Sequence, residues 1–112
     1  MPRRIDQRAR AERVWPILVD TSRLRMTITY GDLSSKVGLH HRAARHFLAF
    51  IQEQMRVRKL PPIQALVVNQ RTREPGAGLA VAHTGKAWQR QLAKVYAHRW
   101  PTHAPFGRRT PR

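Results

Sequence analysis

Residues 27–45 read TITYGDLSSKVGLHHRAAR, and this stretch decides the fold. Thr29 and Asp32 form a T-x-x-D pattern, a variant of the capping box in which a threonine hydroxyl accepts a backbone hydrogen bond at a helix start. The pattern predicts a helix that begins at Tyr30. Gly38 is suited to the left-handed backbone position that commonly follows the end of a helix.

A second helix is expected over about residues 40–57, directly after a short turn. Its apolar residues recur every three or four positions, which is the spacing of one core-facing stripe. The stripe consists of Ala44, Phe47, Leu48, Ile51 and Met55. The opposite face consists of Arg42, Arg45, Ala49, Gln52 and Arg56. Two helices joined by a glycine turn predict a helix-turn-helix, whose second helix enters a DNA groove.

The segment before this motif is expected to be helical. Apolar residues fall at roughly helical spacing from Ala11 onward. Pro16 interrupts them, and it either kinks the helix or sits in the first turn of a new one. Residues 1–10 are expected to form a basic arm that leads into this helix, and residues 26–29 to form a short extended segment.

The segment after the motif is expected to contain a wing. Residues 63–69 (IQALVVN) are the strongest strand candidate, because they are rich in β-branched residues. Residues 69–78 have the composition of a turn, and residues 79–82 (LAVA) can form a return strand. A last helix, capped by Thr84, is predicted over about residues 85–99. Its apolar stripe is Trp88, Leu92, Val95 and Tyr96.

Together these elements predict a single, mainly α-helical domain with a small β-hairpin, a winged helix-turn-helix. The domain is expected to cover residues 11–100. Residues 101–112 contain three prolines and three arginines without periodicity, and they predict a disordered basic tail.

The charge of the chain points to a polyanionic partner. The 112 residues include 22 Lys and Arg but only 6 Asp and Glu, which gives a formal net charge of +16. Repulsion among so many like charges is most simply offset by nucleic acid, whose phosphates are dense and regularly spaced. Acidic protein surfaces, anionic membranes and ribosomal RNA are the alternatives.

Composition also excludes several classes of protein. The chain has no cysteine, so disulfide frameworks, zinc sites built on thiolates and cysteine nucleophiles are excluded. The first 13 residues lack the apolar core of a signal peptide, and no window approaches about 18 apolar residues. We therefore expect a cytoplasmic protein, associated with the nucleoid if bacterial, and no membrane partner.

Neither an active site nor a metal site is expected. The six acidic residues are spread singly through the sequence, and a metal-dependent nuclease needs carboxylates that converge on its ions. The six histidines include no pair at the i, i+4 spacing that would place two ligands on one helix face. We therefore expect no catalytic residue, no metal and no cofactor.

The candidate nucleic-acid contacts fall in three groups. A recognition helix reads bases mainly through its N-terminal part, although a solvated charged face is the simpler alternative. On the second helix the candidates are His41, Arg42, Arg45, His46, Gln52 and Arg56. At the tip of the wing they are Arg71 and Arg73. In the arm they are Arg3, Arg4, Arg8 and Arg10, which could equally belong to a disordered charged terminus.

TITYGDLSSKVG followed by RAAR resembles the winged-helix domain of alkylguanine-DNA alkyltransferases and alkyltransferase-like proteins, over about residues 11–80. The resemblance implies that Tyr30 corresponds to the family's tyrosine, which lies near the target phosphate and helps to rotate the nucleotide. It also implies that Arg45 corresponds to the arginine that fills the space left by a flipped base. The match requires one extra residue in the turn after Gly38.

The chain departs from this family at the reactive segment. The family's P-C-H-R or P-W-H-R should fall in or near residues 63–68, where this chain reads PPIQALVVNQ. Without a thiolate there is no acceptor for an alkyl group. The resemblance therefore implies a DNA-binding scaffold that lacks alkyl-transfer chemistry.

The sequence thus predicts a non-enzymatic protein that places a basic helix, wing and arm on double-stranded DNA. Two alternatives stay open. One is a protein-docking module that recruits or inhibits an enzyme complex, and the other is a protein associated with structured RNA or the ribosome.

Overall fold

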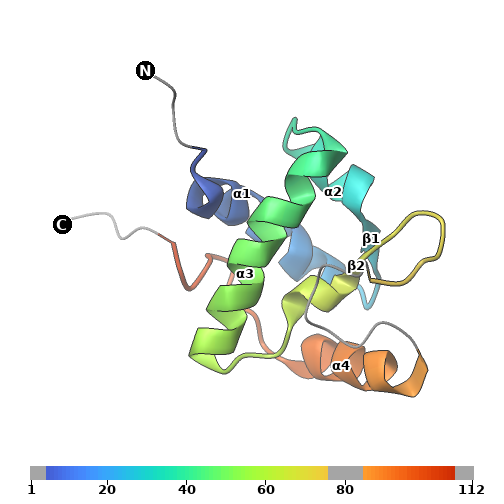
Figure 1. Ribbon diagram of the computed structural model, residues 1–112. Coiled ribbons are helices and arrows are strands. Elements are labelled where there is room, and N and C mark those ends of the chain that lie inside the picture. Colours follow the sequence, from blue (N-terminus) through green and yellow to red (C-terminus); the bar gives the residue numbers. More distant parts are fainter. Residues whose placement is uncertain (1–4, 76–84, 108–112) are drawn as a thin grey trace.

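Helices dominate the computed structural model, which describes residues 5–75 and 85–107 (Figure 1). In these ranges the chain forms one domain with a two-stranded sheet. Its helices and strands, in chain order, are α1 (Gln7–Arg23), β1 (Ile28–Thr29), α2 (Tyr30–Lys36), α3 (Ala44–Arg58), β2 (Val67–Val68) and α4 (Gly85–Ala97). A 3₁₀ turn, His41–Ala43, precedes α3, and a second one, Ile63–Leu66, precedes β2. None of the described helices is long and apolar enough to cross a membrane.

The turn between α2 and α3 is built as the sequence predicts. The Thr29 hydroxyl oxygen accepts a hydrogen bond from the Asp32 backbone N–H at 3.1 Å, so α2 begins at Tyr30. Gly38 has a φ of 72°, which an L side chain rarely adopts. Its N–H and that of Leu39 bond back to the last turn of α2, at 3.0 and 2.9 Å, in the pattern of a Schellman motif.

The start of the next helix differs from the expected one. α3 begins at Ala44, not near His40, because residues 41–43 form a 3₁₀ turn. The His40 ring caps this turn, since its Nδ1 accepts a hydrogen bond from the Arg42 N–H at 3.2 Å. The predicted apolar stripe of α3 is confirmed, because all five of its residues are buried.

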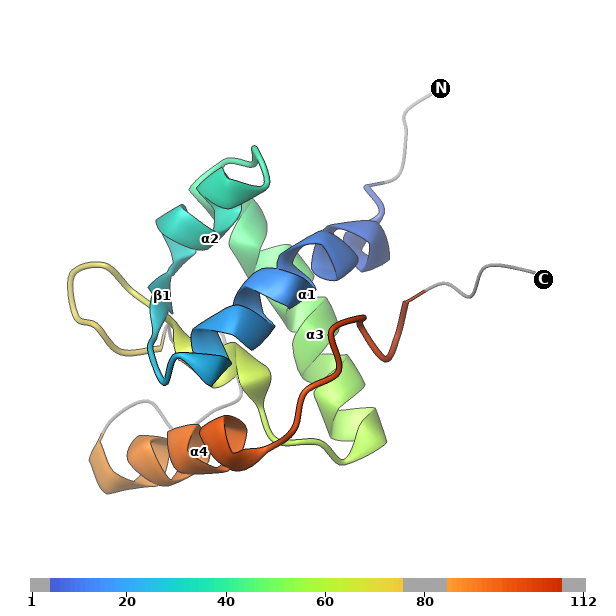
Figure 2. The ribbon, with the colours of Figure 1, turned by 180° about the vertical axis from the view of Figure 1, so that it is seen from behind.

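α1 packs against α3, and in front of it in the view of Figure 2, as one continuous helix that contains Pro16. It begins at Gln7, so residues 7–10 of the expected arm are helical. Asp6 caps it by accepting a hydrogen bond from the Ala9 N–H at 3.0 Å. Ala11, Val14, Trp15 and Leu18 are fully buried on its inner side.

The predicted strand over residues 63–69 is wrong in its first half. Residues Ile63–Leu66 form a buried 3₁₀ turn closed by a hydrogen bond from the Ala65 N–H to the Pro62 carbonyl at 2.9 Å. A short apolar run fits a buried strand and a buried turn equally well, so the pattern alone could not decide. β2 pairs in parallel with β1, Ile28 with Val67. The expected return strand, residues 79–82, lies outside the described residues.

α4 covers the lower end of the core in Figure 1. It ends at Ala97, two residues before the predicted end, and Thr84, its predicted cap, lies outside the described residues. Of its apolar stripe, Val95 is fully buried, and the other three residues pack half-buried against the core. The Trp88 indole N–H donates to the Ala65 carbonyl at 3.1 Å, which joins α4 to the turn before β2.

The expected disordered tail is structured in its first part. Phe106 is 1% exposed, and its ring meets Trp15 and Phe50 edge-on, at centroid distances of 5.4 Å each. The Arg8 guanidinium donates to the Phe106 carbonyl and lies 5.3 Å from the Phe50 ring. Phe106 therefore anchors residues 101–107 on the core, whereas residues 108–112 lie outside the described chain.

The burial of Phe106 predicts a large effect of its truncation. Phe106→Ala should lower the free energy of unfolding by roughly 3–5 kcal/mol, the usual loss for a buried phenylalanine. Chemical denaturation measures this, and Thr102→Ala, an exposed change in the same segment, should stay within about 0.5 kcal/mol. A Phe106→Ala protein as stable as the wild type would show that the segment does not pack on the core.

Candidate nucleic-acid interface

The outward side of α3 and of the 3₁₀ turn before it carries a row of mostly polar residues that we call the basic row of α3. α3 crosses the front of the molecule in Figure 1, with α1 behind it, so this side faces solvent. Arg42 and Arg45 are exposed, as are His41 and His46 beside them. Gln52 is half-buried. The row consists of Arg42, Arg45, Ala49, Gln52 and Arg56.

The cations at the start of α3 are not explained by the stability of the helix. The N-terminus of a helix carries a partial positive charge, which favours acidic side chains and disfavours basic ones. Neither the 3₁₀ turn nor the first turn of α3 contains an acidic residue. Arg42 and Arg45 nevertheless lie there, and neither forms an ion pair with a described residue. Their charges therefore add to the field of the helix end, where an anion would be stabilised.

Of the histidines beside these arginines, His40 caps the 3₁₀ turn that precedes α3. The His40 and His41 rings lie 4.1 Å apart between centroids, tilted by 35°. The Nδ1 of His40 accepts a hydrogen bond from the Arg42 N–H at 3.2 Å. His40 thus fixes the 3₁₀ turn that carries Arg42, whereas His41 and His46 are exposed.

The far end of the basic row of α3 is neutralised within the helix. Arg56 Nε donates to Glu53 Oε1 at 2.9 Å, and a second guanidinium nitrogen lies 2.5 Å from the other carboxylate oxygen. The hydrogen bond from Arg56 lowers the pKa of the Glu53 carboxyl, and the same bond raises the pKa of Arg56. The predicted contact residue Arg56 is therefore engaged, and the uncompensated charge lies at Arg42 and Arg45.

The Glu53–Arg56 pair can be tested by titration. In the wild type we expect the pKa of Glu53 to lie below its ordinary value of 4.5, because Arg56 stabilises the carboxylate. The pair is then intact at neutral pH and is lost as the pH falls through the lowered pKa. In Arg56→Gln the pKa should return towards 4.5. NMR titration of the Glu53 carboxyl measures both, with Arg58→Gln as the control that leaves it unchanged. An identical pKa in wild type and Arg56→Gln would contradict the pairing.

The loop after β2 holds the other two predicted contacts. The Asn69 N–H donates to the Glu74 carbonyl at 2.8 Å, and the Asn69 side chain accepts from the Arg71 N–H at 2.8 Å. The described part of this loop, residues 69–75, stands out from the side of the molecule in Figure 1. Arg71 and Arg73 are both exposed on it, and Arg73 has a φ of 60°.

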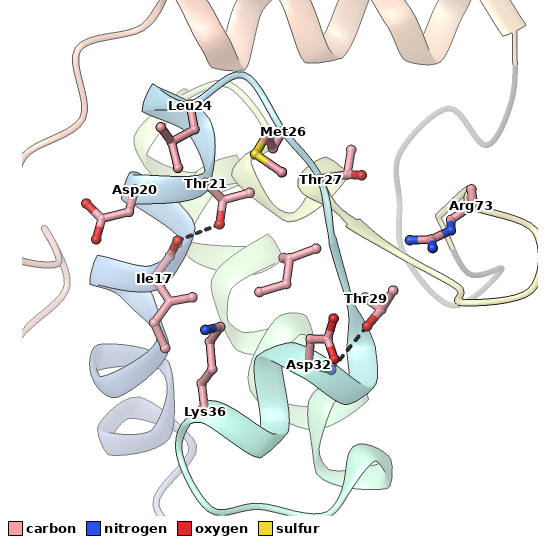
Figure 3. A pocket seen from close by; sticks show the side chains of 11 residues that line it. Ile17, Asp20, Thr21, Leu24, Met26, Thr27, Thr29, Asp32, Lys36 and Arg73 are labelled. Atoms are coloured by element: carbon pink, nitrogen blue, oxygen red, sulfur yellow. Dashed lines mark hydrogen bonds between the residues drawn. The ribbon is translucent and has the colours of Figure 1, made fainter.

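Arg73 also lines a pocket of about 400 Å³ between α1, β1 and α2 (Figure 3). Lys36 and Asp32, four residues apart on α2, line it as well, and neither forms an ion pair with a described residue. Leu24 and Met26 at its rim are 69% and 56% exposed. Figure 3 shows the Arg73 guanidinium turned towards this pocket. Of the two arginines on the loop, Arg71 is therefore the better placed to contact a partner outside the chain.

The remaining predicted contacts lie away from α3's outward side. Tyr30 is half-buried against the core at the start of α2. Arg8 is bound to the Phe106 carbonyl, and Arg10 is half-buried on α1. Arg3 and Arg4 lie outside the described residues.

The segment that would hold the reactive residues of the resembled family is closed. Ile63, Ala65 and Leu66 are fully buried, and Gln64 is 2% exposed, so this turn presents almost no side-chain surface to solvent. Within residues 5–75 and 85–107, no three His, Asp or Glu side chains gather where they could hold a metal ion.

A second row of cations, which the sequence analysis did not single out, lies on α4. Its exposed members are four residues apart on the side opposite the apolar stripe. None of them forms an ion pair with a described residue. The signal was present in the sequence, because residues 85–97 contain no acidic residue. We call this the basic row of α4, and it consists of Lys86, Arg90 and Lys94.

Comparison with known proteins gives no further guide to this surface. The chain matches no protein-family model, no curated protein and no solved structure.

Proposed function

We propose that this protein binds double-stranded DNA without catalysing a reaction, with the N-terminal half of the basic row of α3 as its principal contact. The observation that carries the proposal is the position of Arg42 and Arg45. Both are exposed and free of ion pairs in the described chain, at a helix end whose own field disfavours them. A phosphate chain offsets this repulsion.

The surrounding geometry supports contact through α3. α2, the Gly38 turn and α3 follow one another as in a helix-turn-helix, and α1 packs against α3 (Figure 2). In such motifs the N-terminal residues of the second helix contact base edges. Arg45 then reaches bases, as the resemblance to the alkyltransferase winged helix also implies, while Arg42 and His46 contact the backbone.

The ends of the contact surface are proposed to reach flanking phosphates. α3 lies between the start of α1 on one side and the loop of residues 69–75 on the other (Figure 1). Arg71 on that loop therefore extends the surface in one direction. We expect a protein with this function in the cytoplasm, associated with the nucleoid in a bacterium.

Fluorescence anisotropy with matched duplex DNA, single-stranded DNA and duplex RNA across a salt series tests this function. If roughly 6–10 phosphates are neutralised, log K should fall against log salt with a slope of about −5 to −9. Arg45→Gln should weaken duplex binding by about 1–3 kcal/mol if it contacts a base. Arg58→Gln, an exposed change on the same helix outside the row, is the matched control.

Two results would overturn the proposal. One is the absence of salt-sensitive duplex binding at low salt. The other is equal loss of binding in Arg45→Gln and Arg58→Gln, which would mean that only net charge matters. Tighter binding to RNA than to DNA would favour the alternative of a protein associated with structured RNA.

The ion pair between Glu53 and Arg56 on α3 predicts a variant that binds duplex DNA more tightly than the wild type. Glu53→Gln removes an acidic group beside the proposed interface and releases the Arg56 guanidinium. Duplex binding should become tighter, and its salt slope should steepen by about 0.9 if Arg56 gains one phosphate contact. The same anisotropy series measures this change. Unchanged or weaker binding would show that DNA does not approach this part of α3.

A further inference from the structure

The proposed contact on α3 leaves the basic row of α4 without a role. Its three cations are spaced by four residues, so they lie about 6 Å apart along one line of the helix. Like charges at this spacing destabilise a helix, and α4 has no acidic residue to offset them. The helix field favours Lys94 in the last turn but disfavours Lys86 at the N-terminal end, so the unfavourable charge of the row lies at Lys86 and its neighbour Arg90.

The two basic rows face different sides of the molecule. The apolar sides of α3 and α4 pack into the same core, so each helix presents its opposite side outward. α3 crosses the front of Figure 1 and the back of Figure 2, whereas α4 lies along the lower end in both views. A duplex is stiff over distances far longer than this protein, with a persistence length of about 50 nm. A segment that lies on α3 does not smoothly bend round to α4.

The basic row of α4 is also held in a fixed orientation. The Trp88 indole N–H donates to the Ala65 carbonyl at 3.1 Å, and the Tyr96 hydroxyl donates to the Met26 carbonyl at 3.0 Å. The Ser22 hydroxyl donates to the Val95 carbonyl at 3.2 Å. These bonds join α4 to three other segments, so its outward side does not rotate towards α3.

We propose that the basic row of α4 is a second phosphate-contacting surface, which binds a duplex segment separate from the one on α3. One molecule then bridges two segments of DNA. The row spans about 12 Å, enough to lie along three or four successive phosphates of one strand, which follow at 3.4 Å along the axis. This inference rests on the proposed DNA-binding function of α3, but it concerns a different surface.

A bridging assay separates the two proposals. One duplex is immobilised on beads, protein is added, and retention of a second, fluorescently labelled duplex is measured. The α4 variant carries Lys86→Gln, Arg90→Gln and Lys94→Gln. Its matched control, which loses the same number of exposed cations outside both rows, carries Lys36→Gln, Arg58→Gln and Lys59→Gln. The α3 variant carries Arg42→Gln and Arg45→Gln. Circular dichroism confirms that each variant is folded.

We expect the wild type and the matched control to retain the second duplex, and the α4 variant to retain on the order of tenfold less. The α4 variant should still bind a single short duplex in solution, whereas the α3 variant should lose that binding. Sedimentation at the assay concentration establishes whether the protein self-associates.

Three results would overturn bridging through α4 while leaving DNA binding through α3 intact. The first is a wild type that binds a single duplex but retains no second one. The second is bridging that persists in the α4 variant, as self-association through another surface would produce. The third is equal loss of single-duplex binding in the α3 and α4 variants, which would indicate one continuous surface. Absence of all duplex binding by the wild type would overturn both proposals.

Discussion

The burial of the Trp15 indole is the constraint on which the rest of the structure depends. Trp15 is 0% exposed at the middle of α1, and its ring meets Trp100 and Phe106 edge-on, at 5.6 and 5.4 Å. Its indole N–H donates to the Pro101 carbonyl at 2.9 Å. The Trp100 indole N–H in turn donates to the Val95 carbonyl of α4 at 2.8 Å. One side chain thus joins the beginning of the chain to its end, and α3 lies against the helix that carries it.

This core leaves the charged residues almost entirely outside it. The buried polar side chains of the described residues are threonine, serine and glutamine, and none is charged. The cations are therefore distributed over outward helix faces, where water screens them and repulsion between them is weak but cumulative. The two rows on α3 and α4 are the places where this repulsion works against the helix that carries it. A protein with this distribution gains stability when an anion binds, because ligands that bind only the folded state stabilise it.

The parts of this fold that could be predicted from sequence are those governed by local rules. The cap at Thr29, the left-handed Gly38 and the stripe of α3 depend on residues within one or two turns of each other. Residues 63–66 could not be assigned in this way, because an apolar run does not distinguish a buried strand from a buried turn. Phe106 is a single aromatic residue in a segment rich in proline and arginine, and its contacts with Trp15, Phe50 and Arg8, all distant in sequence, hold it in place.

The candidate site was predictable to a similar degree. The exposure of Arg45 follows from the helical period, since the residues that face the core fix those that face solvent, whereas Arg42 lies in the 3₁₀ turn that the sequence analysis did not predict. The pair of Glu53 and Arg56 was also accessible from sequence, because residues three apart on a helix are neighbours. The orientation of Arg73 towards a pocket could not be predicted from sequence, because it depends on where the loop lies relative to β1 and α2.

The small sheet has a consequence for how the protein unfolds locally. β1 immediately precedes α2, and β2 lies beyond α3, so the parallel pair of Ile28 with Val67 joins the two ends of the segment that contains α2 and α3. The chain between β1 and β2 is a closed loop. The conformational entropy that the chain loses when this loop closes is regained only when the two strands separate. The amides of α2 and α3 should therefore exchange with solvent as one cooperative unit. A substitution that weakens the pairing of β1 with β2 would therefore also destabilise α3, the proposed DNA-binding helix, although no residue of α3 is changed.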